Sequence, residues 1–382
     1  MKIITFQKFT WNHLFYIAYL IIARCRKLLT EPLLGEKTEK SGYFFLMYNT
    51  VLSQFLSIIP YLIRKYLSKS ASTQERKDQN KDNKLNYIYN DKNDYTGRGL
   101  IKFTLLTSII DFVAEASIFI FYYFNDEPEV LSLYTLNSYL IINTVTQYIA
   151  CYFILKTYFY KHHYSSFIIN SICILITLII DVVRIIDKSI SEYKYYIYVF
   201  MRLFRVTLFC FRDCYSKMSL YYAFLSPYSL LLYKALYETL FLIIYSIPFI
   251  FIKMSDLYVN EQSIFVGFKE YLSGIKILYS ILLFITDFLN TLVLTILIDK
   301  FSPSNLTLAF ILESFGSSVY TLFKNLNRGR EIYWNLILSF PIDLILFIGA
   351  MIHNEIFIIN KYGLNLKTKL YLDSKFEENK WI

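Results

Sequence analysis

Apolar runs of roughly 20 residues, separated by shorter polar stretches, recur along most of the chain. A run of this length crosses the ~30 Å hydrocarbon core of a bilayer as a helix, because a helix rises ~1.5 Å per residue. The pattern therefore predicts an all-α, polytopic membrane protein with about ten transmembrane helices. The predicted helices are residues 9–23, 43–63, 101–124, 136–158, 166–186, 194–211, 228–252, 274–298, 305–324 and 333–355.

The composition excludes several other classes of protein. Of the 382 residues, 55% are hydrophobic and 18% are charged, whereas an ordinary globular domain carries about 25% charged residues. This excludes a soluble enzyme, and the long apolar runs exclude an outer-membrane barrel, whose strands would alternate over ~10 residues. The formal charge of +9 gathers in one loop and near the ends of the runs, which is typical of membrane orientation. We therefore expect a lipid bilayer as the surroundings and no nucleic-acid partner.

The charges in the loops predict which side of the membrane each loop faces. The insert at residues 64–99 is rich in Lys, Asn, Asp and Gln, and we predict a disordered loop because it is too polar to bury a core. The acidic loop at 125–129 has no Lys or Arg, and positive charge marks the cytosolic side. The insert, both termini and the tail at 356–382 are therefore predicted to be cytosolic. Two basic clusters would then lie on the other side and favour the reverse orientation: Arg24, Arg26 and Lys27, and Lys324, Arg328 and Arg330.

Polar and ionisable side chains inside the predicted helices are the candidate functional residues, because a charge at mid-bilayer costs about 2.5–3.5 kcal/mol. Asp111 and Glu115 share one helix face and have no cation within a turn. They must be protonated, paired with another helix or hydrated by a cavity, and two neighbouring carboxylates can share a proton for proton coupling. Lys234 and Glu238 form either a self-neutralising pair or, through Lys234, an anion contact. The predicted substrate or ion pathway comprises Asp111, Glu115, Asn143, Gln147, Lys234, Glu238, Asp287 and Asp343.

No motif points to an enzyme, so we predict no catalytic residues and no cofactor. The sequence has no Gly-x-Ser-x-Gly elbow, no His-Glu-x-x-His, no P-loop and no dinucleotide-binding fingerprint. Cys210 and Cys214 are one helical turn apart, but no second Cys/His pair stands at zinc spacing. The pair His162-His163 falls at the end of a predicted helix and is expected to be solvated. We therefore predict no metal site.

Four segments, in their order along the chain, resemble the drug/metabolite transporter superfamily, close to its solute carrier 35 and EamA-like branch. The third helix of the family is similar to LLTSIIDFVAEASIFIFYYF, with its acidic residue at Asp111. Helices four and five are similar to SLYTLNSYLIINTVTQYIACYFILKTYFYKHHYSSFIINSICILITLIIDV. The entry to the second half is similar to MSLYYAFLSPYSLLLYKALYETLFLII, with Pro227 at the usual place. The last helix and its exit are similar to FIGAMIHNEIFIINKYGLNLKTK, through Gly349 and the pair Asn354-Glu355.

The resemblance implies a fold and a function. The fold would be two five-helix halves of opposite orientation, at 1–190 and 194–355, with a substrate site near the midplane and alternating access. The function would be transport of a small organic metabolite, by exchange or by proton coupling, in an endomembrane (Golgi, endoplasmic reticulum or vacuole) or in the plasma membrane. A second copy of the chain is a further candidate partner.

The chain departs from the family at positions that concern the substrate. Relatives commonly carry Arg-Gly where this chain has Asn137-Ser138, which argues against an anionic nucleotide sugar as substrate. They commonly carry Glu-Gly at Lys234-Ala235 and Gly at Glu238, and small residues allow close helix approach. Either the substrate has changed, or the chain is a transport-inactive, transporter-like adaptor or structural protein.

The predicted topology can be tested by cysteine labelling in intact vesicles. We expect single cysteines introduced at Ser70 and Ser132 to lie on opposite sides, because the first follows the basic insert and the second follows the acidic loop. The measurement is reaction with a membrane-impermeant maleimide, with the chain that lacks the introduced cysteine as the control. Labelling of both positions from the same side would contradict the ten-helix arrangement.

Overall fold

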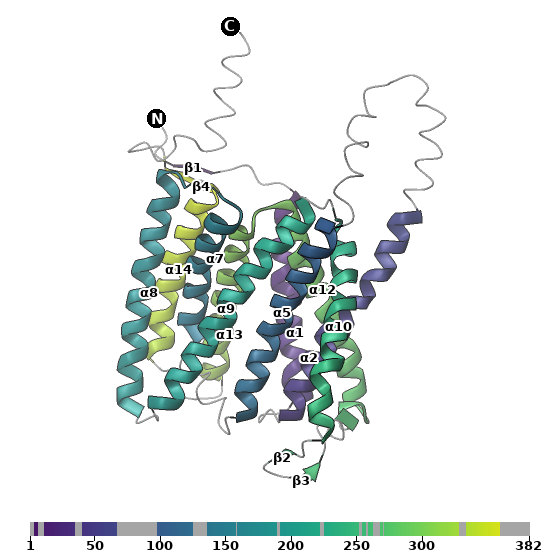
Figure 1. Ribbon diagram of the computed structural model, residues 1–382. Coiled ribbons are helices and arrows are strands. Elements are labelled where there is room, and N and C mark those ends of the chain that lie inside the picture. The colour runs from purple at the N-terminus through teal and green to yellow at the C-terminus, as the bar shows by residue number, and fades with distance from the viewer. Residues whose placement is uncertain are drawn as a thin grey trace, which may run out of the picture. The chain divides into compact units, whose positions relative to one another are not determined.

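The computed structural model describes most of the chain, and within that part the fold is all-helical, with ten α-helices and two short strand pairs (Figure 1). The described residues are 4–6, 11–34, 40–66, 98–124, 136–157, 159–188, 192–221, 225–251, 254–256, 259–262, 268–269, 271–327 and 334–359. The basic insert beyond residue 66, the acidic loop at 125–129 and the tail from residue 360 lie outside the described residues. The predictions that concern these segments therefore stay predictions.

The helices follow one another along the chain with short 3-10 turns at three places. The α-helices are α1 (Leu14–Leu34), α2 (Lys40–Ser53), α5 (Arg98–Phe124), α7 (Leu136–Ile154), α8 (Lys161–Lys188), α9 (Glu192–Tyr221), α10 (Pro227–Phe251), α12 (Lys276–Lys300), α13 (Leu306–Asn327) and α14 (Trp334–His353). The 3-10 turns are η1 (Trp11–His13), η2 (Gln54–Ser57) and η3 (Pro303–Asn305). The strands β1 (Ile4–Phe6) and β4 (Phe357–Ile359) pair antiparallel, as do β2 (Met254–Asp256) and β3 (Val259–Gln262).

Each of the ten predicted helices is present, and the largest errors are at the ends of two of them. The helix predicted at 9–23 begins later and continues through the basic cluster that starts at Arg24. The helix predicted at 194–211 continues for ten residues beyond its predicted end, through Arg212 and Asp213. Charged residues end an apolar run in the sequence, but they do not end a helix when their side chains find partners inside the fold.

Within the described residues, three helices are long and apolar enough to cross a membrane. They are Gly42–Tyr66, which contains η2, Pro227–Phe249 and Lys276–Lys300. On α12 the exposed apolar side chains recur every three or four residues, whereas Asp287 and Ser280 are buried. The exposed side chains of this stripe are Ile277, Leu278, Ile281, Leu282, Ile285 and Leu289. Apolar groups outside and polar groups inside are the arrangement expected of a helix able to cross a membrane.

The described chain divides into two compact units, each of which draws on both halves of the sequence. Unit 1 comprises Met1–Leu20, Phe124–Phe211 and Lys300–Ile382, and unit 2 comprises Ile21–Tyr123 and Arg212–Asp299. Inverted repeats can interleave in space, so this division does not test the predicted halves at 1–190 and 194–355. The two halves and their inverted repeat stay predictions.

Unit 1 depends on a close approach between α8 and α14. Ser166 Oγ donates a hydrogen bond to the backbone oxygen of Gly349 at 2.6 Å, and both residues are buried. A Cβ atom at Gly349 would lie 2.2 Å from Oδ1 of Asn170, whose side chain is fully buried. Only glycine therefore fits at this position without displacing the side chain of Asn170. Next to it, Tyr148 on α7 stacks on His353 with ring centroids 3.6 Å apart.

Unit 2 packs α10 against α2 and η2. Aromatic rings fill one part of this contact, where Phe44 of α2 lies 5.5 Å from Phe249 and 6.3 Å from Tyr245, between ring centroids. At the N-terminus of α10, Pro227 occupies the first turn, and the backbone N–H of Ser229 donates a hydrogen bond to Ser226 Oγ at 3.2 Å. This is an N-terminal cap of the kind that fixes where a helix begins.

The contact between α8 and α14 can be tested with a pair of glycine variants. We expect Gly349→Ala to lower the free energy of unfolding by about 1–3 kcal/mol, because the new methyl group must displace Asn170. The matched control is Gly316→Ala on α13, where a Cβ would meet no atom within 4 Å. This control should be neutral or stabilising by up to about 1 kcal/mol, since alanine favours a helix. Equal thermal stability of the two variants in detergent would contradict the close approach.

Candidate functional site

A cavity within unit 2 collects most of the ionisable side chains predicted to be functional. Its volume is about 120 Å³. A water molecule needs ~10–15 Å³, so the cavity has room for several. Side chains from α1, α2, η2, α5, α9, α10 and α12 line it. Its charged lining consists of Arg26, Asp111, Glu115, Arg212, Asp213, Lys234, Glu238 and Asp287.

Asp111 on α5 is the centre of the largest group of ion pairs. Its Oδ1 accepts a hydrogen bond from Arg212 Nη1 at 2.9 Å, and its Oδ2 accepts one from Lys234 Nζ at 2.5 Å. Arg212 also contacts its neighbour Asp213, with 2.7 Å between Nη2 and Oδ1. Of the three alternatives for Asp111, pairing with other helices and a place at a cavity are both present. A carboxylate held by two cations acts as a fixed counter-ion, which does not favour Asp111 as the proton carrier.

Lys234 and Glu238 on α10 contact each other but are not an isolated pair. Lys234 Nζ lies 3.5 Å from Glu238 Oε1, farther than it lies from Asp111. Glu238 Oε2 accepts a hydrogen bond of 2.7 Å from Gln54 Nε2, which comes from η2. The 3-10 turn therefore brings a polar side chain to the charged cluster, and such turns within a helix often mark functional positions.

A second group of contacts surrounds Asp287 on α12, which is 1% exposed. Arg26 Nε forms an ion pair with Asp287 Oδ1. The opposite oxygen, Oδ2, accepts hydrogen bonds from Asn49 Nδ2 at 2.8 Å and Thr50 Oγ1 at 3.3 Å. Arg26 was assigned from the sequence to a loop whose charge opposed the predicted orientation. Because it lies within α1 and pairs inside unit 2, it no longer counts as a loop charge.

The structure brings five of the eight predicted pathway residues to the cavity: Asp111, Glu115, Lys234, Glu238 and Asp287. The remaining three belong to unit 1 and do not line it. Asn143 Oδ1 lies 3.2 Å from Cys210 Sγ, and Gln147 Nε2 lies 3.8 Å from Cys151 Sγ. Asp343 on α14 is 3% exposed and has one carboxylate oxygen without a hydrogen-bond partner.

The sequence analysis did not predict three charged lining residues, Arg26, Arg212 and Asp213, nor the lining amide Gln54. The three charged residues follow an apolar run or lie just beyond its predicted end, outside the predicted helices. The sequence signal that could have found Arg212 and Asp213 is the apolar pattern that continues beyond Arg212, at Cys214 and Leu220. Both of these residues are buried.

The expectation for the histidine pair is also wrong in part. His162 was expected to be solvated, but its side chain is 3% exposed. His162 contacts Glu355 and the rings of Tyr160 and His163, whereas His163 is only half-buried.

Comparison with known proteins gives no family for this chain. No protein-family model matches the sequence, and no curated protein matches it with significant similarity. The resemblance to the drug/metabolite transporter superfamily therefore stays a proposal.

The charged cluster can be tested by removing its members singly and together. We expect Lys234→Met to lower the free energy of unfolding by about 3–5 kcal/mol, as does the loss of one partner from other buried ion pairs. Adding Glu238→Gln should recover part of this loss, with a coupling of about 0.5–3 kcal/mol, because Asp111 still has Arg212. Adding Asp111→Asn to Lys234→Met should recover less of the lost stability. In that double variant, Glu238 stays buried without the cation that it contacts in the wild type.

The measurement is thermal or denaturant unfolding in detergent. Lys102→Met, at an exposed position of α5, is the control and should change stability by no more than about 0.5 kcal/mol. Purely additive losses in both double variants would contradict the pairing.

Proposed function

We propose that the protein is a multi-pass membrane transporter that moves a small organic metabolite by alternating access, as an exchanger or as a proton-linked carrier. The observation that carries this proposal is a cavity with eight charged lining residues in a unit that contains the three helices able to cross a membrane. Charges at this depth are costly unless they are paired or hydrated, and they are typical of solute and ion pathways.

The finer architecture belongs to the same proposal. In it, all ten helices cross the membrane as two five-helix halves of opposite orientation, in an endomembrane or the plasma membrane. The similarity of the segment around Asp111 and of the last helix to the drug/metabolite transporter superfamily supports this arrangement. The presence of a helix at each of the ten predicted places is compatible with it.

The charges of the cavity favour one class of solute. Five carboxylates and three cations line it, and each cation already contacts a carboxylate. No cation of this lining is therefore spare for an anionic solute, whereas the excess of carboxylates attracts positive charge. We propose a cationic, zwitterionic or neutral polar metabolite, which agrees with the absence of the family's Arg-Gly pair at Asn137-Ser138.

A transport-inactive adaptor is the second candidate, and one observation favours it. The same contacts that neutralise Arg212, Lys234 and Arg26 would also hold the helices of unit 2 in one fixed arrangement. A protein that serves as a structural partner needs such pairing, and it needs no exchange of partners during a cycle.

Uptake into proteoliposomes distinguishes the two candidates. The purified chain is reconstituted and offered cationic, zwitterionic, neutral and anionic metabolites, with and without a pH gradient and with solute exchange measured separately. We expect uptake from the first three classes and a loss of at least about tenfold in Asp111→Asn, a difference of 1.4 kcal/mol or more in the barrier, because Arg212 and Lys234 lose their shared counter-ion.

Two further carboxylate variants complete the design. Glu115→Gln changes a carboxylate at the cavity, and in a proton-linked carrier it lowers pH-driven uptake more than exchange. Asp343→Asn removes a buried carboxylate of unit 1 and should leave transport intact. Folded protein that takes up no solute of any class would contradict the transporter and support the adaptor.

A further inference from the structure

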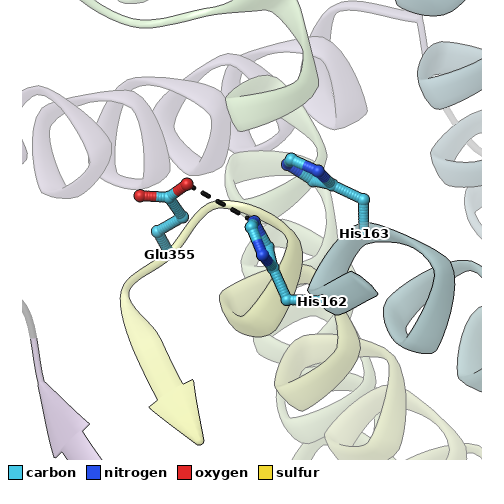
Figure 2. Close-up of side chains that lie close together, drawn as sticks. All are labelled: His162, His163 and Glu355. Carbon is cyan, nitrogen blue, oxygen red and sulfur yellow. Dashed lines mark ion pairs between the residues drawn. The ribbon is translucent and has the colours of Figure 1, made fainter. Parts of the chain in front are cut away.

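A cluster of two histidines and one glutamate lies in unit 1, apart from the residues that line the cavity (Figure 2). His162 and His163 stand in the first turn of α8, and Glu355 follows the end of α14, just before β4. One potential ligand atom from each of the three residues lies within 4.8 Å of the others. Two imidazole nitrogens and a carboxylate oxygen are a common ligand set for divalent transition metals.

The backbone at Glu355 is held in a conformation that a glutamate rarely adopts. Its φ is +58°, in the left-handed region. The N–H of Ile356 donates to the backbone oxygen of Met351 at 3.0 Å, and the N–H of Glu355 donates to that of Ile352 at 3.2 Å. These two bonds form the Schellman motif that ends a helix, in which the left-handed position is usually glycine. Strained positions of this kind are common at functional sites, and here the side chain placed by the strained residue is a carboxylate.

His162 is buried, and its ring nitrogens make no hydrogen bond with the described residues. The side chain is 3% exposed. Its Nε2 lies 3.3 Å from Oε1 of Glu355, toward which the ring points in Figure 2. A buried polar group without a hydrogen bond costs about 1–3 kcal/mol, and a bound ion would remove this cost.

His163 has a ring nitrogen, Nδ1, that acts as a hydrogen-bond acceptor and can therefore offer a lone pair. The N–H of Tyr160 donates to Nδ1 of His163 at 2.9 Å, so this nitrogen carries no proton. Metal binding at His163 would replace this hydrogen bond or turn the ring, and the half-buried position leaves room for either.

The two helices that carry the cluster are fixed relative to each other within unit 1. Ser166, one turn beyond His162, holds the backbone of Gly349, and the missing side chain at Gly349 lets α8 approach α14. Ligands on rigid, closely packed elements need little reorganisation to bind an ion.

We propose that His162, His163 and Glu355 bind a divalent transition-metal ion, with Zn²⁺ as the ion that this ligand set accommodates most readily. The remaining coordination positions are filled by water, as in other three-ligand zinc sites. The ion ties the first turn of α8 to the end of α14, and through the adjacent β4 to the N-terminal strand β1. The site is independent of the proposed transport function, because none of its residues lines the cavity.

The test uses the purified full-length chain in detergent, stripped with a chelator and titrated with Zn²⁺ alone. We expect one Zn²⁺ per chain after desalting, measured by elemental mass spectrometry, and a rise in Tm on addition of the metal. Replacement of Zn²⁺ by Co²⁺ gives visible absorption bands that report nitrogen and oxygen ligands directly. Absence of any bound metal in the folded chain would overturn the proposal.

The decisive variant is Glu355→Gly, which is expected to fold well. Glycine relieves the strain at φ +58°, so the metal-free Tm should rise above that of the wild type. At the same time the Zn²⁺-dependent rise in Tm should disappear, and affinity should fall by more than the ~10–100-fold lost with an outer-shell partner. His163→Gln should weaken binding likewise, whereas the control His13→Gln, at a histidine outside the cluster, should not. Zn²⁺ binding that is unchanged in Glu355→Gly and His163→Gln would overturn the proposal.

Discussion

The arrangement of unit 2 depends on the need to neutralise charges that lie inside apolar helices. Asp111 on α5 forms ion pairs with Arg212 on α9 and Lys234 on α10, and these contacts hold three helices together. Taking each charge out of water costs several kcal/mol, which only close partners and further hydrogen bonds offset. A helix that slid by one turn would separate these partners and leave buried charges alone, so the pairs specify the register of the helices as well as their contact.

The same constraint explains why polar groups face inward in this unit. Asp287 is surrounded by Arg26, Asn49 and Thr50, which come from α1 and α2, while the opposite side of α12 presents isoleucine and leucine. Each polar side chain on these helices needs a partner, and hydrocarbon offers none. An apolar exposed surface is what a helix long and apolar enough to cross a membrane presents to lipid. A polar interior with a small cavity is what remains once these side chains have found partners.

The number and order of the helices could be predicted from the sequence, whereas the charged site could be predicted only in part. Run length fixes where a helix exists, and Asp111 and Lys234 stood out because charges are rare within such runs. Arg26 and Arg212 could not be predicted as site residues, because a charge at the end of an apolar run resembles the boundary of a membrane span. Their partners on other helices, Asp287 and Asp111, are visible only in the structure. The separation of Asn143, Gln147 and Asp343 from the cavity is likewise a matter of tertiary structure. The spacing of residues along one helix shows which side chains share a face, but it does not show which compact unit that face packs into.

Whether the charged cluster serves transport or only holds the helices together depends on its ability to exchange partners. Lys234 already contacts two carboxylates, Asp111 on α5 and Glu238 on its own helix, at 2.5 and 3.5 Å. A cation shared in this way can move toward one carboxylate as the other is protonated or meets a solute, without ever losing all of its partners. Such an exchange needs a shift of only about 1 Å, and bistable contacts of this size convert a local event into movement of whole helices. Asp111 is shared with Arg212, so Glu238 gives Lys234 a carboxylate that Arg212 does not contact. Glu238, kept in place by Gln54 from the 3-10 turn, therefore offers Lys234 a second position, which the proposed transport cycle needs and an adaptor does not.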